Sequence, residues 1–162
     1  MIAGAVHALA ISGPRATAAL AEALAPALRP GDLLALWGEL GVGKTSFARA
    51  LIRARTGEGV VPSPTYTLVQ IYDGAPPIWH LDLFRLRRPE EALDLGIEEA
   101  LEEAIVLLEW PERLGAHLPP TRLDLRFAYA QAPDERTLDL CGHGGWAARI
   151  DAVLPALRAA VA

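Results

Sequence analysis

A glycine-rich segment contains the residues whose types and spacing point most clearly to chemistry. The segment reads Gly38-Glu39-Leu40-Gly41-Val42-Gly43-Lys44-Thr45, and it matches the pattern G-x-x-x-x-G-K-[ST] of a phosphate-binding loop. Glycine lets such a loop turn tightly and bring its backbone N–H groups against phosphate oxygens, while the N-terminus of the following helix adds a positive field. We therefore predict a nucleoside triphosphate site in which Lys44 reaches the β- and γ-phosphates and the Thr45 hydroxyl binds Mg²⁺.

A glycine-rich turn that precedes Lys-Thr by chance is the alternative interpretation of this segment. Two observations argue against it. The segment follows the apolar run Leu33–Trp37 and precedes a helical pattern at residues 44–55, which is the context that the motif requires. Lys44 is also the only lysine beside 14 arginines, and a point-charge ammonium does what a guanidinium fork cannot at this position.

Two acidic residues stand at the carboxyl ends of apolar segments, as the glycine-rich loop does. Asp82 ends the segment Ile78–Asp82, and Glu109 follows residues 104–108. If these segments are parallel strands, both acids and the loop meet at one edge of the sheet, where open α/β folds bind ligands. Glu109 then holds Mg²⁺ directly or through water, and Asp82 orients the attacking water or accepts its proton. A solvated strand end is the alternative for either acid alone.

Three further features have a functional and a plain structural interpretation. Thr65, in the proline-bracketed Ser63-Pro64-Thr65, could sense the γ-phosphate or its Mg²⁺ as a switch segment does, or the segment could be a rigid connector. His80 lies two residues before Asp82 and shares its side of the strand. We interpret His80 as a packed or hydrogen-bonded histidine rather than a general base. The arginines that follow Asp82 could touch RNA or a partner, but we interpret them as a solvated face; they are Arg85, Arg87 and Arg88.

The elements that must position these residues follow from periodicity and from turn residues. Strands are predicted at residues 6–11, 33–37, 66–72, 78–82 and 104–108, with an antiparallel pair at 122–129 and 136–141. Helices are predicted at residues 15–28, 44–55 and 146–161, the last kinked at Pro155, with a helical stretch at 89–103 broken near Gly96. These elements predict an α/β fold, a single P-loop NTPase domain over residues 1–162. Its central sheet is mixed but mainly parallel and is flanked by helices, with an antiparallel C-terminal strand pair.

Composition excludes several classes of protein. The 162 residues are 52% hydrophobic and 22% charged, as expected of one globular domain. The net charge of −5 offers no general attraction to nucleic acid, so any RNA contact should be local or indirect. The single cysteine, Cys141, excludes an internal disulfide and a cysteine-rich metal site. Because no signal peptide or long apolar stretch is evident, we expect a cytoplasmic location without a membrane.

Taken together, the motifs resemble the bacterial threonylcarbamoyl-adenosine ATPase family, TsaE. The resemblance extends over residues 33–112, about half of the chain, and is far more specific than the phosphate loop alone. Its motifs are residues 38–45, Ser-Pro-Thr-Tyr-Thr-Leu at 63–68, Tyr72, His-Leu-Asp-Leu-Phe-Arg-Leu at 80–86, Leu95-Gly96 with Glu98-Glu99, and Glu109-Trp110-Pro111-Glu112. The departures are small: Ser46 stands where a second threonine is frequent, and Phe84 where tyrosine is frequent.

The resemblance implies a weak ATPase that uses ATP and Mg²⁺ and works with two partner proteins, of the TsaD and TsaB type. Together they transfer a threonylcarbamoyl group to the adenosine beside the anticodon of certain tRNAs, so the chain meets tRNA through the complex. By this likeness Thr45 and Glu109 hold Mg²⁺, and Asp82 supports hydrolysis. Residues 63–67 form a switch-like segment. Trp110 and Thr17 lie near the nucleotide, Thr17 on the adenine side, and Ser46 follows the loop.

Two other functions remain open at this stage. A small P-loop kinase acting on a metabolite needs an acceptor site and usually an arginine-bearing lid, and no such insertion is evident. A noncatalytic ATP-sensing subunit would keep Lys44 and Thr45 but would have no need of Asp82. A GTPase is disfavoured because guanine recognition of the Asn-Lys-x-Asp type requires asparagine, which the chain lacks.

Overall fold

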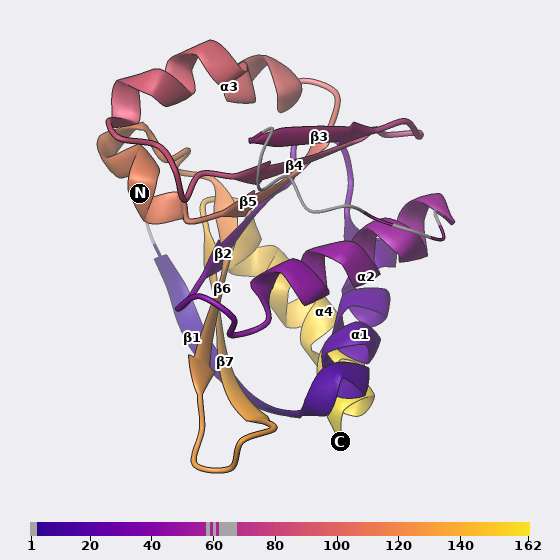
Figure 1. Ribbon diagram of the computed structural model, residues 1–162. Coiled ribbons are helices and arrows are strands. Elements are labelled where there is room, and N and C mark those ends of the chain that lie inside the picture. The colour runs from indigo at the N-terminus through magenta and orange to yellow at the C-terminus, as the bar shows by residue number, and fades with distance from the viewer. Residues whose placement is uncertain (1–2, 58, 60, 62–67) are drawn as a thin grey trace.

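The computed structural model describes residues 3–57, 59, 61 and 68–162, and in this part of the chain the centre is a seven-stranded sheet (Figure 1). Its spatial order is β1-β7-β6-β2-β5-β4-β3. The strands are β1 (Ala3–Ser12), β2 (Leu33–Trp37), β3 (Val69–Tyr72), β4 (Ile78–Asp82), β5 (Ile105–Glu109), β6 (Arg122–Tyr129) and β7 (Glu135–His143).

Strand direction follows the predicted mixture. β2 pairs in parallel with both β5 and β6, and β5 pairs in parallel with β4. β7 is antiparallel to β6, and β1 is antiparallel to β7, so β1 again runs with the parallel group. β3 joins the opposite edge antiparallel to β4. The mainly parallel sheet and the antiparallel C-terminal pair are both confirmed.

Helices cover both faces of the sheet (Figure 1). On one face lie α1 (Gly13–Leu24), α2 (Lys44–Thr56) and α4 (Trp146–Val161), with the 3₁₀ turn η1 (Ala25–Ala27). On the other lie α3 (Ile97–Ala100) and the 3₁₀ segments η2 (Pro89–Leu95) and η3 (Pro111–His117). Because both faces of β2 and β5 are covered, these strands are apolar instead of alternating, except for Glu109 at the end of β5.

The two faces form two hydrophobic clusters. In β2, Leu34 and Leu36 pack toward α1, α2 and α4, whereas Leu33 and Ala35 pack toward the 3₁₀ segments. The same alternation in β5 places Ile105 and Leu107 on the α2 side. Since side chains alternate along a strand, Glu109 continues on the face that α2 covers. The face on which each strand residue lies therefore determines which polar side chains can meet at the end of the sheet.

Several predicted boundaries were wrong, each for a local reason. The helix predicted at residues 15–28 ends as an α-helix at Leu24, because Pro26 has no N–H for the next helical hydrogen bond and the chain tightens into η1. The strand predicted at 66–72 begins at Val69, since Leu68 has a left-handed φ of 62°. Tyr66 and Thr67 lie outside the described residues.

Other boundary predictions held or moved slightly. The break near Gly96 is confirmed: its φ of 76° separates η2 from α3. α4 is continuous through Pro155. The strands predicted at residues 6–11, 104–108 and 136–141 are observed as β1, β5 and β7 with ends shifted by one to three residues. Within the described ranges, none of the helices has the length and apolar character needed to cross a bilayer.

Candidate functional site

The glycine-rich loop connects β2 to α2 and adopts a backbone that its glycines make possible. Gly38, Gly41 and Gly43 have φ angles of 142°, 79° and 126°, which residues with a Cβ atom rarely adopt. Gly38 is also packed tightly, since a Cβ there would lie 2.7 Å from the Phe127 carbonyl oxygen and 2.8 Å from Val42 Cγ1. The sequence pattern of the loop therefore corresponds to a specific backbone shape held against β6.

The β6–β7 hairpin holds two backbone carbonyl groups of this loop. The Tyr129 hydroxyl donates a hydrogen bond to the Leu40 carbonyl oxygen at 3.0 Å, and Arg136 Nε donates to the Val42 carbonyl oxygen at 3.0 Å. The Arg136 guanidinium also lies 4.5 Å from the Tyr129 ring centre. Sequence analysis missed both residues, because nothing local links a tyrosine and an arginine to a loop about 90 residues earlier.

Lys44 is buried at the first position of α2, with 4% of its surface exposed. Its Nζ donates to the Gly38 carbonyl oxygen and lies 3.4 Å from the centre of the Trp110 ring. Burial lowers the pKa of Lys44, while the charges of Glu109, Glu112 and Asp82 oppose that shift. The ammonium group thus feels the charge of three carboxylates, but among the described residues it forms no direct ion pair with any of them.

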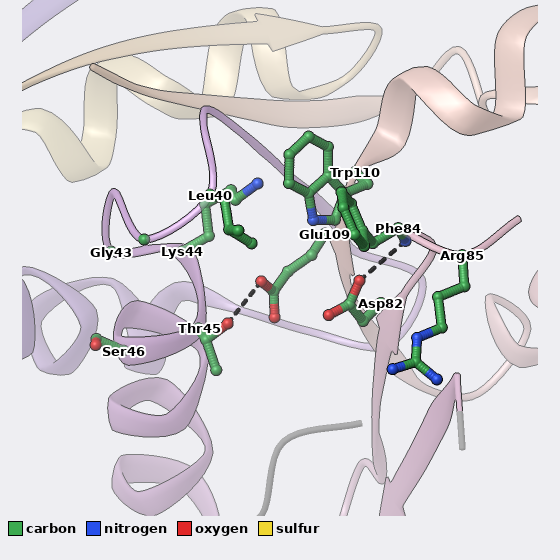
Figure 2. A pocket seen from close by; sticks show the side chains of 11 residues that line it. Leu40, Gly43, Lys44, Thr45, Ser46, Asp82, Phe84, Arg85, Glu109 and Trp110 are labelled. Atoms are coloured by element: carbon green, nitrogen blue, oxygen red, sulfur yellow. Dashed lines mark hydrogen bonds between the residues drawn. The ribbon is translucent and has the colours of Figure 1, made fainter. Parts of the chain in front are cut away.

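Trp110 adopts an unusual backbone conformation directly after β5. Its φ and ψ of 61° and 52° are left-handed, which is rare for a residue with a large side chain. The ring packs on Phe84, with the ring centres 4.9 Å apart, and covers the Lys44 ammonium (Figure 2). Trp110 therefore forms one wall of the predicted phosphate site.

Thr45 and Glu109, the two predicted Mg²⁺ ligands, lie in direct contact (Figure 2). The Thr45 hydroxyl donates to Glu109 Oε1 at 2.7 Å, and the other carboxylate oxygen, Oε2, lies 2.7 Å from His80 Nε2. Glu109 and His80 are 2% and 0% exposed. His80 is hydrogen-bonded, as predicted, but its partner could not be named from the sequence.

Asp82 completes the acidic side of the site. It is the register partner of Glu109 in the parallel β4–β5 pair, and its Oδ1 accepts a hydrogen bond from Phe84 N at 3.0 Å. Burial raises the pKa of Asp82, and the negative charge of Glu109 adds to that shift. Both acids thus lie at the edge of the sheet where α2 begins, as the sequence predicted.

A cavity of about 300 Å³ lies between these residues (Figure 2). It is lined by Leu40, Gly41, Gly43, Lys44, Thr45, Ser46, Asp82, Phe84, Arg85, Glu109 and Trp110. The loop and α2 supply one wall, and the ends of β4 and β5 supply the other. The cavity therefore gathers the predicted phosphate-binding, metal-binding and catalytic side chains in one place.

The remaining predicted residues lie around the loop. Thr17, in α1, lines a second hollow of about 160 Å³ that shares Gly41, Gly43 and Ser46 with the first cavity. Its hydroxyl donates to the Gly13 carbonyl oxygen at 3.4 Å. Glu39 and Leu40 are exposed, Val42 is buried under the loop, and Thr65 lies outside the described residues.

A mainly parallel sheet with a glycine-rich loop between β2 and α2, and with acids at the neighbouring strand ends, defines the fold class of P-loop NTPase domains. Comparison with known proteins narrows this class. The family described as "Threonylcarbamoyl adenosine biosynthesis protein TsaE" matches residues 11–138. The chain belongs to the TsaE family.

Individual relatives agree with this assignment. A tRNA threonylcarbamoyladenosine biosynthesis protein TsaE of Rickettsia felis is 40% identical over 119 residues, covering 72% of this chain and 70% of the relative. The protein of the same name from Bacillus subtilis is 35% identical over 133 residues, covering 81% and 82%. The crystal structure of Bacillus subtilis YdiB superposes with a TM-score of 0.77 at 27% identity, covering 97% of this chain and 96% of that one.

Gly38→Ala tests whether the loop requires its glycine backbone. Alanine would meet the Phe127 carbonyl in a conformation that L-residues avoid, so we expect a loss of at least about 2 kcal/mol in the free energy of unfolding. Urea unfolding measures the loss. Gly145→Ala is the control, because Gly145 is exposed with open space around its Cα, and its change should stay below about 1 kcal/mol. Equal stability of the two variants would contradict the packing described for Gly38.

Asp82→Asn tests the electrostatic state of the site. Because the pKa of Asp82 is raised on folding, its protonated form contributes stability at low pH, and this contribution is lost as pH rises through the raised pKa. We expect the variant to be more stable than the parent at pH 7, by about 0.5 kcal/mol or less, since the group is only partly buried and is screened by solvent. The difference should vanish below about pH 3, under the ordinary pKa of aspartate.

Thermal unfolding of parent and variant across pH 3–8 measures this difference. Asp94→Asn, at an exposed carboxylate outside the cavity, controls for the change in net charge. A parent chain that is more stable than Asp82→Asn at pH 7 would contradict the desolvation of Asp82.

Proposed function

We propose that this chain is a Mg²⁺-dependent ATP hydrolase of low turnover that supports formation of N6-threonylcarbamoyladenosine beside the anticodon of tRNA. It acts in the cytoplasm with two partner proteins, of the TsaD and TsaB type, and meets tRNA through that complex. The observation that carries the proposal is the hydrogen bond of Thr45 to Glu109, in the cavity that Lys44 and the glycine-rich loop also line. Membership of the TsaE family supports the biosynthetic role.

The residues present fit a Mg²⁺ ion. Mg²⁺ prefers hard oxygen ligands in octahedral geometry and usually keeps several waters beside one or two protein ligands and substrate phosphates. Thr45 Oγ1 and Glu109 Oε1 are such oxygens and lie 2.7 Å apart. Among the described residues, no group of three or more His, Cys, Asp and Glu side chains could hold a metal ion. A site completed by phosphate and water matches this pair.

Lys44 supplies the positive charge for the phosphates. Its ammonium group is held by the Gly38 carbonyl oxygen and the Trp110 ring, and both are weaker partners for an ammonium than an anionic phosphate oxygen. Burial lowers the pKa of Lys44. The negative charges of bound phosphates would act in the opposite direction and favour the ionised form of Lys44. Lys44 would therefore bind the β- and γ-phosphates of ATP in preference to these partners, and Mg²⁺ would supply further neutralisation of the phosphate charge.

Asp82 is placed to act on water. Its carboxylate lines the same cavity as Lys44 and Thr45, and burial raises its pKa toward the range in which a carboxylate accepts a proton more readily. In this assignment Asp82 orients the attacking water or accepts its proton. Thr17 and Trp110, which line the two neighbouring hollows, would lie near the nucleotide, and Thr65 would sense the γ-phosphate.

Glu109→Ala tests the metal ligand. Removing the carboxylate takes away one of the two protein oxygens, so we expect Mg²⁺-dependent ATP hydrolysis to fall at least about tenfold and its half-saturating Mg²⁺ concentration to rise. Phosphate release at stepped MgCl₂ measures both. Glu112→Ala is the matched control, because Glu112 is exposed and acts on Lys44 only through its charge. Unchanged Mg²⁺ dependence in Glu109→Ala would remove Glu109 from the site.

Reconstitution of tRNA modification tests the wider function. Purified TsaD- and TsaB-type partners, tRNA, ATP and an activated threonylcarbamoyl donor should yield modified adenosine with this chain and little without it. Lys44→Ala should neither bind ATP nor support the reaction, because the buried ammonium is lost. Modified nucleoside is measured by mass spectrometry. Equal yield without the chain would refute the role.

The same assay separates the rival functions. If the parent chain binds ATP without hydrolysing it, and Asp82→Ala supports modification as well as the parent does, the chain is a noncatalytic ATP-sensing subunit. If the γ-phosphate appears on a metabolite acceptor instead of as inorganic phosphate, the chain is a small kinase.

A further inference from the structure

We propose that His80 is a positioning residue that holds the Glu109 carboxylate in the orientation needed to bind Mg²⁺, an inference that rests on the proposed function. His80 Nε2 lies 2.7 Å from Glu109 Oε2, and its side chain is fully buried. Nothing in the phosphate-loop motif requires a histidine on the strand beside the metal ligand. The geometry nevertheless ties this histidine to the carboxylate that the loop threonine contacts.

Strand register explains how His80 reaches Glu109. In the parallel β4–β5 pair, Asp82 is opposite Glu109 and His80 is opposite Leu107. Side chains alternate along a strand, so His80 and Asp82 share the face that α2 covers. The imidazole of His80, two residues before Asp82 on the same face, thus reaches Glu109 Oε2, and His80 does not line the cavity that Asp82 lines.

The two oxygens of Glu109 are held by different donors with different roles. Oε1 accepts from Thr45, the predicted Mg²⁺ ligand, and Oε2 is bonded to His80. A glutamate side chain has three rotatable bonds, and a carboxylate that is 2% exposed is costly without hydrogen-bond donors. The bond to His80 therefore fixes the rotamer and leaves Oε1 directed at the loop. Partners of this kind to metal ligands are worth about 10–100-fold in metal affinity.

The unpaired nitrogen of His80 is consistent with this assignment. Nδ1 is buried and has no hydrogen-bond partner among the described residues. A ring with its hydrogen on Nε2 donates to Glu109 and leaves only an acceptor unsatisfied, whereas a hydrogen on Nδ1 would be a buried donor without an acceptor. The carboxylate thus selects the tautomer that donates to it.

His80 is a positioning residue and not the general base. Its ring is fully buried, it does not line the cavity, and its one partnered nitrogen is bonded to Glu109. Asp82 lines the cavity instead. Loss of His80 should therefore weaken Mg²⁺ binding first, without removing the phosphate-binding loop.

Substitution of His80 by Gln and by Asn separates positioning from packing. A glutamine amide nitrogen reaches the place of Nε2 and can donate to Glu109, whereas the shorter asparagine places its amide near Nδ1. With ADP as the probe in calorimetry, both variants should keep parental affinity within about twofold in EDTA, because the loop is unchanged. In stepped MgCl₂, His80→Asn and His80→Leu should raise the half-saturating Mg²⁺ concentration about 10–100-fold, and His80→Gln should stay within about threefold.

His143→Gln and His143→Asn are the matched controls. His143 Nε2 makes a similar bond, 2.8 Å to Asp124 Oδ2, on β7 away from the cavity. These variants report the effect of changing a histidine–carboxylate bond on folding alone, and they should leave the Mg²⁺ dependence unchanged. Thermal unfolding identifies the folded variants.

The outcomes are distinct. A folded His80→Asn chain with the parental Mg²⁺ dependence would overturn the inference, as would equal shifts in the His80→Gln and His80→Asn variants. If His80→Leu fails to fold, the Gln and Asn pair still decides. A parental chain whose ADP binding does not respond to Mg²⁺ at all would overturn the proposed function itself, independently of His80.

Discussion

A carboxylate buried beside a lysine is the interaction on which this site depends. Glu109 is 2% exposed, and such a group is tolerated only when its oxygens are bonded. Thr45 and His80 provide those bonds, one from α2 and one from β4. The first turn of α2, the end of β5 and the middle of β4 are therefore linked through one side chain, so the positions of the loop and of the strands depend on each other.

The glycine-rich loop is held as much by distant segments as by its own sequence. Tyr129 and Arg136 bond the carbonyl groups of Leu40 and Val42, and β6 leaves no room for a side chain at Gly38. A phosphate cradle functions best when its backbone is already arranged before the ligand arrives. The β6–β7 hairpin, which carries no recognisable motif, provides much of that arrangement.

The strengths and failures of sequence analysis have specific causes. Leu33–Trp37 and the apolar segment before Glu109 are recognisable as buried strands from their continuous apolar sequence. That sequence is continuous because helices cover both faces of each strand. The alanine-rich pattern predicts a helix that continues past Pro26, but α1 ends at Leu24 because proline cannot supply the next N–H donor. The acids at strand ends were placed correctly, since parallel strands bring their carboxyl ends to one edge. For His80 the sequence predicts a hydrogen bond but not its partner, because the residue that faces a histidine on the neighbouring strand depends on the strand register.

By itself the sequence determined the features on which the proposed chemistry rests: a complete phosphate-loop motif, a single lysine, and two acids each ending an apolar run. These features are local in the chain and follow from residue type and periodicity. Only the tertiary structure decided which groups touch: Glu109 between Thr45 and His80, Lys44 over the Trp110 ring, and Arg136 on the loop. Those contacts join residues 29 to 94 positions apart, and strand order and register, which no local pattern encodes, bring them together.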